Sequence, residues 1–469
     1  MTTAHPSGAQ RTVVLVTAAL SARHLNADTP HLRELARSFG GVRTLRPSAP
    51  AVTCTSQGDL LTGQPPRYHG AVANGWMDRD QCEVRLWRQS NRLLQGPMVW
   101  ETARKRFPGM TVANLFGWFN MFSSADITVT PRPKYAADGR KHPDILSTPR
   151  ALRDRLQAEL GHFPLFNFWG PRADIRSTEW IAQATQRVMQ WHDPALTLCY
   201  LPHMDYVLQR EGPNGAHVRQ ELRELDRVIA DLLQACHKRD ARVIVCSDYG
   251  IEQATQVVHP NQSLHAAGLL AAREEFGGDA LDLNASRVFA VCDHQIAHVY
   301  GIDPTALPEA REILSALPGV ERVLGADELH EIELDHPRSG DLVMLAKPGA
   351  WFAYPWWLSD RVAPDYARTV DIHRKPGYDP CELLLSDSPM VANAKFAWFK
   401  LRKSLGFRAL LQLTPLDASL VHGTHGRVDL DPALDPVLLA EGAFLPDHAR
   451  MPLRSVHDVI LRHLAGEHA

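Results

Sequence analysis

The sequence predicts an α/β fold in which a largely parallel central sheet is flanked by helices. Short runs of β-branched and apolar residues recur without polar alternation, as in strands buried on both faces of a parallel sheet. A helical pattern separates two of these runs, which makes a strand–helix–strand unit. With 45% hydrophobic and 22% charged residues over 469 positions, the chain can also bury a large core.

The first strand is expected at Thr12–Ala18, which reads TVVLVTA. Similar runs predict further strands at Leu196–Leu201, Ala241–Cys246, Arg287–Val291 (a weaker pattern) and Asp341–Ala346. Between the second and third runs, residues 216–239 predict a helix, because their apolar residues recur at helical spacing: Leu222, Leu225, Val228, Ile229, Leu232 and Leu233.

Two ranges interrupt this rhythm and are interpreted as insertions into a single domain of residues 1–469. Residues 76–191 are rich in aromatic residues, and residues 347–420 combine aromatic residues with a basic run. Such aromatic residues either form small cores of their own that anchor the insertions, or line a cap over an apolar or cyclic substrate group.

Charge and cysteine content exclude several classes of protein. The 50 Lys and Arg residues nearly balance 53 Asp and Glu residues, giving a net charge of −3, which argues against a protein that wraps nucleic acid or a polybasic membrane binder. Seven scattered cysteines without a CxxC pair argue against a disulfide framework and favour a reducing compartment. The apolar run at Thr12–Leu20 is too short to span a bilayer, so we expect a cytoplasmic protein without a membrane span.

Polar residues follow several predicted strands, where ligands bind in open α/β sheets. Ahead of them lies a block that runs from Thr53 to Asn74 and contains Leu61-Thr62-Gly63 and His69-Gly70. The other segments carry His203, Asp205 and Gln209, then Asp248 and Tyr249, and finally His422 and His425.

In this order and spacing, the segments resemble the alkaline phosphatase superfamily. The most similar branch is the type I phosphodiesterase/nucleotide pyrophosphatase group, with phosphonoacetate hydrolases nearby. The resemblance runs from the first strand to Ser455–Ile460, which looks like the family's closing helix. Its strongest part is the first block, where Thr53 stands nine residues before Thr62, as the family's nucleophilic Thr does. The resemblance implies an alkaline phosphatase-like α/β core with inserted cap elements.

The resemblance also implies metal chemistry, because in this family two divalent ions, usually zinc, flank the phosphoryl group. Three of the family's ligand positions are substituted here, by Ala18, Gln209 and Tyr249. We therefore expect one ion at most, of zinc, manganese or magnesium, bound weakly. The ligands that the resemblance assigns to it are Asp205, Gln209 and His425.

The resemblance also implies roles for the remaining residues. Thr53 would attack phosphorus, Asn74 would stabilise the phosphoryl oxygens, and Asp248 would orient Thr53 or act as base. Tyr249 would donate a hydrogen bond, and His203 and His422 are auxiliary candidates. Three of these residues have a simpler interpretation: Thr53 as a helix N-cap, and the two histidines as residues at the surface or ones that only support the site.

The sequence leaves three hypotheses about function. The leading hypothesis is a divergent phosphodiesterase-like hydrolase of a small phosphorylated substrate, with Thr53 as nucleophile. The alternative is an inactive pseudoenzyme of the same fold that binds a phosphorylated metabolite or a protein partner. Metal-independent chemistry with His203 or His425 as general base is a third hypothesis.

Other polar segments fit either a site or solvated loops. Residues 371–380 suit a loop that folds over a site. Arg338, Arg374 and Lys375 are candidate anion-binding residues, with solvated loops as the alternative. His259, His294 and His298 lie near predicted strands and are expected to be structural.

Overall fold

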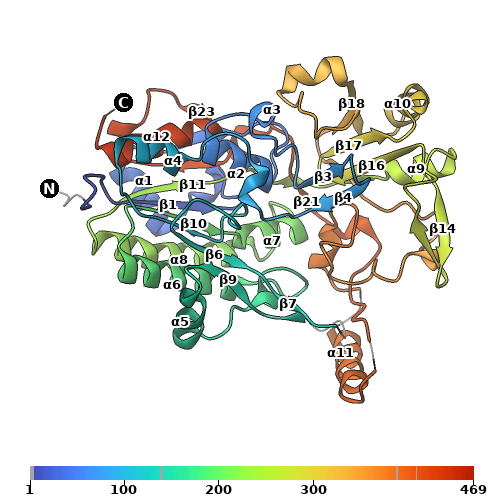
Figure 1. Cartoon of the computed structure of the whole chain (residues 1–469), viewed down its shortest axis with the longest axis horizontal. Helices are drawn as coiled ribbons and strands as arrows, with labels where there is room; N and C mark the ends of the chain where they lie inside the picture. The colour runs from blue at the N-terminus through green and yellow to red at the C-terminus, as the bar shows by residue number, and fades with distance from the viewer. Residues whose placement is uncertain (1–4, 138–140, 387–388, 408, 469) are drawn as a thin grey trace.

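The computed structural model describes residues 5–137, 141–386, 389–407 and 409–468, and within them the largest sheet has nine strands (Figure 1). The strand order is β23-β2-β22-β11-β1-β10-β5-β6-β9. In chain order these strands are β1 (Thr12–Thr17), β2 (Arg43–Arg46), β5 (Val112–Leu115), β6 (Ile127–Pro131), β9 (Ile145–Thr148), β10 (Leu196–Leu201), β11 (Arg242–Cys246), β22 (Val437–Leu439) and β23 (Arg450–Pro452).

The centre of this sheet is parallel. Strand β1 pairs in parallel with both β10 and β11, so that Val16 lies opposite Tyr200 on one side and Cys246 on the other. Strands β5 and β6 continue the parallel arrangement, whereas β9 and β22 run antiparallel to their neighbours. Strands β1 and β10 are buried along their whole length, as their apolar runs predict. The largely parallel α/β core is therefore confirmed.

Helices cover both faces of the central sheet (Figure 1). One group contains α2 (Thr53–Thr62), α4 (Val99–Arg106) and α12 (Val456–Ala465), and α12 contacts the other two as well as β1. The helix predicted between the second and third strands is α8 (Val218–His237), which packs on β11. Around α8 and its neighbours lie α1 (Pro30–Ser38), α5 (Ala151–Leu160), α6 (Ile175–His192) and α7 (His203–Glu211).

Two predicted strands lie outside the central sheet. They are β16 (Val288–Asp293) and β19 (Leu342–Ala346), which we had expected in the parallel sheet. They belong instead to an antiparallel sheet of four strands, order β16-β17-β19-β18, with β17 (Ile296–Gly301) and β18 (Val320–Gly325). Helices α9 (Pro260–Ala266) and α10 (Leu307–Ser315) pack on it. A strand that is covered on both faces is apolar throughout in either kind of sheet, so the pattern did not distinguish them.

The range 76–191 also differs from the expected insertion, because it supplies β5, β6 and β9 to the central sheet. Phe116, Phe163 and Trp180 pack edge to face or tilted in the main core. The range 76–191 begins within the hairpin of β3 (Gly75–Asp78) and β4 (Glu83–Leu86), and β3 contacts β16 of the second sheet.

Much of the range 347–420 packs on the second sheet through aromatic residues such as Trp356 and Trp357. The remaining elements are short, apart from α11 (Pro389–Ser404): α3 (Pro66–His69), β7 (Lys134–Tyr135), β8 (Lys141–His142), β12 (Glu252–Gln253), β13 (Gln256–Val258), β14 (Ala272–Glu275), β15 (Gly278–Leu281), β20 (Ala350–Phe352) and β21 (Gly423–Thr424).

Residues 72–74 join the two sheets through buried polar contacts. His298 of β17 donates from Nε2 to the carbonyl of Val72 at 3.1 Å and accepts at Nδ1 from the Gly340 backbone at 3.0 Å. Asn74 donates its backbone and side-chain N–H groups to Asp293, at 2.7 and 3.0 Å. His298 is thus a structural histidine, and burial lowers its pKa to about 4.

This buried imidazole makes stability depend on pH. Because the pKa of His298 is lowered on folding, only the unfolded chain takes up this proton as the pH falls from about 6.5 to about 4, so stability is lost in that window. Gln can make both hydrogen bonds without titrating. We expect His298→Gln to reduce the pH dependence of the unfolding free energy by about 1.4 kcal/mol per pH unit. Urea unfolding at several pH values between 5 and 7, on the order of a half unit apart, measures this, and identical pH profiles would contradict it.

Candidate active site

The carboxyl ends of the central strands bring together the four side chains on which the hydrolase hypothesis depends. Thr53 is the first residue of α2, Asp205 lies in the first turn of α7, and Asp248 lies two residues after the end of β11. His425 follows β21, which pairs with β12 shortly after β11. These segments are far apart in sequence and meet because β1, β10 and β11 run in the same direction.

Tyr249 connects two of these side chains. Its hydroxyl donates a hydrogen bond to Asp205 Oδ1 at 3.0 Å and lies 3.4 Å from Thr53 Oγ1. Burial raises the pKa of Tyr249 well above its ordinary value, so the phenol stays neutral. Thr53 also lies beside Tyr200, a second phenol whose pKa burial raises. Sequence reasoning missed Tyr200, because its position inside a buried strand gives no polar signal.

Gln209 holds Asp205 from the next turn of α7. Its Nε2 donates to Asp205 Oδ2 at 2.7 Å, while its Oε1 accepts from the Tyr378 hydroxyl at 2.8 Å. The opposite amide orientation would place an oxygen against the carboxylate, so this orientation follows from the network. Gln209 therefore presents a donor to Asp205, which differs from its expected role as a metal ligand. Burial raises the pKa of Asp205 to about 6, and the hydrogen bonds from Gln209 and Tyr249 oppose that rise.

Four aromatic rings stack across the site. Tyr249 lies parallel to His425 with ring centroids 3.8 Å apart, His425 faces His294 at 3.6 Å, and His294 faces Tyr378 at 3.9 Å. His294 occupies the turn between β16 and β17 with φ +56°, a left-handed conformation that is uncommon for residues other than glycine. We had expected a structural role for His294. Tyr378 comes from the 371–380 loop, which the sequence did indicate as one that folds over a site.

His425 is oriented by the backbone. Its Nδ1 donates to the carbonyl of Ala51 at 2.7 Å, which leaves Nε2 as the unprotonated nitrogen, 3.9 Å from Asp205 Oδ1. Burial lowers the pKa of His425 to about 3, so the ring is neutral near pH 7. An imidazole held in this way suits either a metal ion or a hydrogen-bond donor at Nε2.

Asp248 makes its hydrogen bonds to the backbone. Its Oδ1 accepts from the N–H groups of Ala19 and Tyr249, at 3.3 and 3.0 Å, while the buried Oδ2 has no hydrogen-bond partner. Burial raises the pKa of Asp248 to about 8. A buried carboxyl with one oxygen unsatisfied must hold a proton or face a cation or water.

Asn74 is engaged elsewhere than expected. Its Oδ1 accepts from the backbone of Cys54 at 3.0 Å, and its Nδ2 donates to Asp293. Asn74 thus fastens the first turn of α2, and with it Thr53, to the turn of the second sheet. One of its side-chain N–H groups is thus already used by Asp293, and the role of Asn74 at a phosphoryl group stays a prediction.

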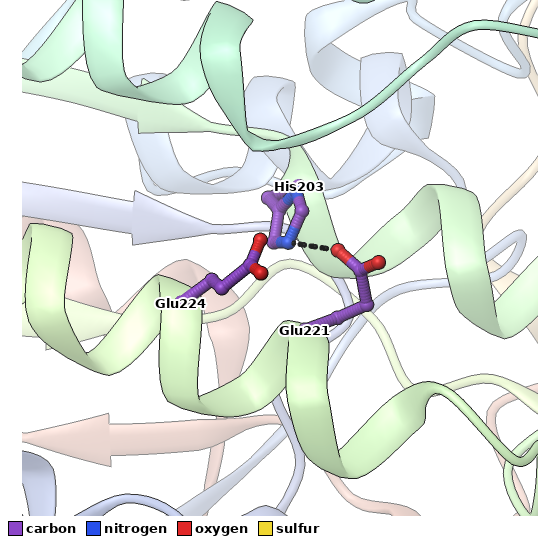
Figure 2. Close-up of side chains that lie close together, drawn as sticks. All are labelled: His203, Glu221 and Glu224. Atoms are coloured by element: carbon purple, nitrogen blue, oxygen red, sulfur yellow. Dashed lines mark ion pairs between the residues drawn. The ribbon is translucent and has the colours of Figure 1, made fainter.

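The auxiliary histidines lie apart from Thr53. His203 begins α7, two residues before Asp205, and residues two apart on a helix point to different sides. Figure 2 shows His203 facing Glu221 and Glu224 of α8, with Nε2 at 2.7 Å from a Glu221 oxygen. Within the described residues, these three side chains are the group with metal-ligand spacing. Glu221 lies within ion-pair distance of His203, and Gln220 donates a hydrogen bond to Glu224, but neither buried ring nitrogen of His203 has a hydrogen-bond partner. His422 is exposed.

The three candidate anion-binding residues have structural partners. Lys375 is buried and pairs with Asp379 at 2.7 Å and Glu382 at 2.8 Å. Arg338 donates to the carbonyls of Gly70 and Leu93, and Arg374 lies beside Asp371. These contacts fix the loop that carries Tyr378 and the segment after α3.

The donor set suits one divalent ion better than two. Asp205 and the free Nε2 of His425 face each other, and the unsatisfied Oδ2 of Asp248 lies in the same buried region. Two zinc ions would need about six to eight protein donors. Ala18 offers none, Tyr249 holds a proton on its oxygen, and Gln209 turns its amide N–H to Asp205.

Comparison with known proteins agrees with this architecture. A phosphonoacetate hydrolase from Sinorhizobium meliloti, solved with phosphonoformate, superposes with a TM-score of 0.62 at 14% identity, covering 97% of this chain and 96% of that one. Murine ectonucleotide pyrophosphatase/phosphodiesterase 5, solved as an inactive variant with AMP, gives a TM-score of 0.57 at 14% identity over 98% and 96%. At this identity the likeness concerns the fold.

A relative identified by sequence carries a similar description. An uncharacterized pyrophosphatase/phosphodiesterase of Schizosaccharomyces pombe is 24% identical over 236 residues, which are 48% of this chain and 41% of that relative. The chain thus spans about two fifths of that curated relative. Across the described residues, no helix combines the length and the apolar character needed to cross a membrane. Residues 12–379 match the family described as type I phosphodiesterase/nucleotide pyrophosphatase, and the chain belongs to that family.

Proposed function

We propose that this protein hydrolyses a small phosphate ester of the phosphodiester or pyrophosphate class, with Thr53 as the nucleophile. One observation carries the proposal: the Thr53 hydroxyl, at the start of a ten-residue helix, lies against the Tyr249 hydroxyl, which is itself bonded to Asp205. The helix N-terminus favours an anionic group beside Thr53. Family membership supports phosphoester hydrolysis as the reaction class.

Tyr249 positions the proton of Thr53. Because the phenol donates its own hydrogen to Asp205, its oxygen can accept the hydrogen of Thr53. A lone pair of Thr53 Oγ1 is then free for attack on phosphorus. The Oγ1–P bond forms, the ester P–O bond breaks, and the alcohol leaves with its electron pair and takes a proton from solvent. The Thr53 proton passes to the Tyr249 oxygen as the Tyr249 proton passes to the Asp205 carboxylate, which later returns it to solvent. Water then displaces Thr53 from phosphorus and restores the hydroxyl.

One divalent ion held by Asp205 and His425 would neutralise phosphoryl charge when bound. Three buried carboxyl groups give a reason to expect this ion. They are Asp205, Asp248 and Asp293, and burial raises the pKa of each. An anionic ester entering beside them needs a compensating cation. Oxygen donors with a single imidazole favour manganese or magnesium over tightly bound zinc.

The nucleophile is tested by Thr53→Ala. We expect turnover of bis(p-nitrophenyl) phosphate to fall at least about a thousandfold, because the attacking oxygen is removed. Ser56→Ala is the matched control, since Ser56 lies in the same helix and its buried hydroxyl has no hydrogen-bond partner. Its turnover should stay within about twofold of the parent. Equal activity in Thr53→Ala and the parent would contradict the mechanism.

The cation is tested by removing divalent ions with a chelator and adding back manganese, magnesium or zinc singly. We expect activity to return with an oxygen-preferring ion, and His425→Ala to raise the concentration for half-maximal activity about tenfold or more. His422→Ala is the control, because this exposed residue lies three positions away. Full activity in the chelated protein would contradict a cation requirement.

The alternative of a pseudoenzyme also has an observation in its favour. The Tyr249 phenol lies between Thr53 and Asp205, and only 7% of Thr53 is exposed. Access for an ester therefore requires the 371–380 loop or the β16–β17 turn to move. Binding of AMP without turnover under any added cation would favour this second function.

A further inference from the structure

Helix α11 projects away from both sheets. Figure 1 shows it at the lower edge of the molecule, beyond the second sheet, with little of the fold around it. It follows the short helix Pro380–Leu383, which contacts α7, so it extends from the loop that carries Tyr378. Its sequence from 389 to 404 is PMVANAKFAWFKLRKS.

One side of α11 is apolar and exposed. The exposed fractions are 82% for Met390, 61% for Trp398, 49% for Leu401 and 65% for Leu405. These positions recur at intervals of three, four or seven to eight residues, which places them on one face of a helix. Ala394 and Ala397 fall on the same face. Large apolar side chains are seldom exposed together without a partner.

The rest of the helix is cationic and partly self-packed. Phe396 and Phe399 stack with ring centroids 6.5 Å apart, with Lys400 over the first ring at 4.6 Å and Lys403 over the second at 5.1 Å. Residues 389–407 contain Lys395, Lys400, Arg402 and Lys403 and no Asp or Glu, although the whole chain carries a net charge of −3. Positive charge is thus concentrated beside the apolar face.

We propose that α11 docks on the surface of an anionic lipid bilayer, with Met390, Trp398, Leu401 and Leu405 inserted at the headgroup boundary. A helix with Lys and Arg beside a Trp- and Leu-containing face has the chemistry of an interfacial helix. The absence of acidic residues from 389 to 407 complements anionic headgroups. The excess of positive charge beside the apolar face favours an anionic surface over an uncharged protein groove.

Vesicle flotation tests the proposal with the full chain. The probes are phosphatidylcholine vesicles and vesicles in which phosphatidylglycerol makes up about one third of the lipid. We expect flotation with the anionic vesicles at low salt, and at least about a tenfold weaker partition at high salt because charges near the surface are screened. Phosphatidylcholine alone should bind weakly.

Variants assign the binding to α11. The double variant Trp398→Ser, Leu401→Ser should lose at least about tenfold in partition, because it removes two apolar side chains that would insert at the headgroup boundary. Its control is Phe276→Ser, a fully exposed aromatic residue in the β14–β15 turn, which should bind like the parent. Lys400→Gln and Lys403→Gln should each weaken binding by about fivefold, whereas Lys347→Gln should not. Unchanged thermal midpoints show that the variants fold.

Three results would overturn the proposal. The parent fails to float with anionic vesicles, or the double variant floats as well as the parent, or the parent forms a dimer that the double variant abolishes without any lipid binding. The last result would assign the face to a second copy of the chain. Hydrolysis of a soluble ester plays no part in these readouts, so they are independent of the proposed function.

Discussion

The parallel register of β1, β10 and β11 is the constraint on which the site depends. Thr17 lies opposite Leu201, and Val16 lies opposite Cys246, so the three strands end at nearly the same level. The chain therefore leaves the sheet at one edge as the segments that begin at residues 18, 202 and 247. A shift of one residue in either pairing would turn every side chain of that strand to the opposite face and move these segments apart. The close approach of Asp205, Tyr249 and Thr53 is a direct result of this alignment.

The second sheet also contributes residues that hold the site together. The last residue of β16, Asp293, fastens Asn74 and the start of α2, and His294 in the turn after it extends the ring stack over His425. The loop after it supplies Tyr378, which fixes the amide of Gln209. Most of these groups are buried and uncharged near pH 7, so directed hydrogen bonds and ring stacking, more than ion pairs, hold the site in shape. Asp248 Oδ2 is buried beside these groups without a hydrogen-bond partner, so it must hold a proton or face a cation or water.

Sequence patterns predicted β1, β10 and β11, because each is an apolar run. They also predicted that Thr53, Asp205, Asp248 and His425 lie in segments near one edge of the sheet, because the order of segments after the strands follows from the topology. They did not give the antiparallel sheet, since β16 and β19 are buried on both faces and have the same apolar pattern as parallel strands. His294 could not be identified because a left-handed turn residue has no sequence signal unless it is glycine or asparagine. The orientation of Gln209 depends on Tyr378, which is 169 residues away. His203 faces away from Asp205 because the segment after β10 is helical from His203 onward, so residues two positions apart point to different sides.

Strand β2 gains its neighbours in the sheet only after the strands near residue 440 have been made. It pairs only with β22 and β23 among the described strands, and both come from the last part of the chain. During synthesis on the ribosome, residues 43–46 are made early but have no sheet neighbour until residues 437–452 emerge. The Ala51 carbonyl that orients His425 waits equally long for its partner. The nascent protein must therefore carry an incomplete sheet edge while the intervening residues are made, and a chain cut short before residue 437 would lack both the strands that cover that edge.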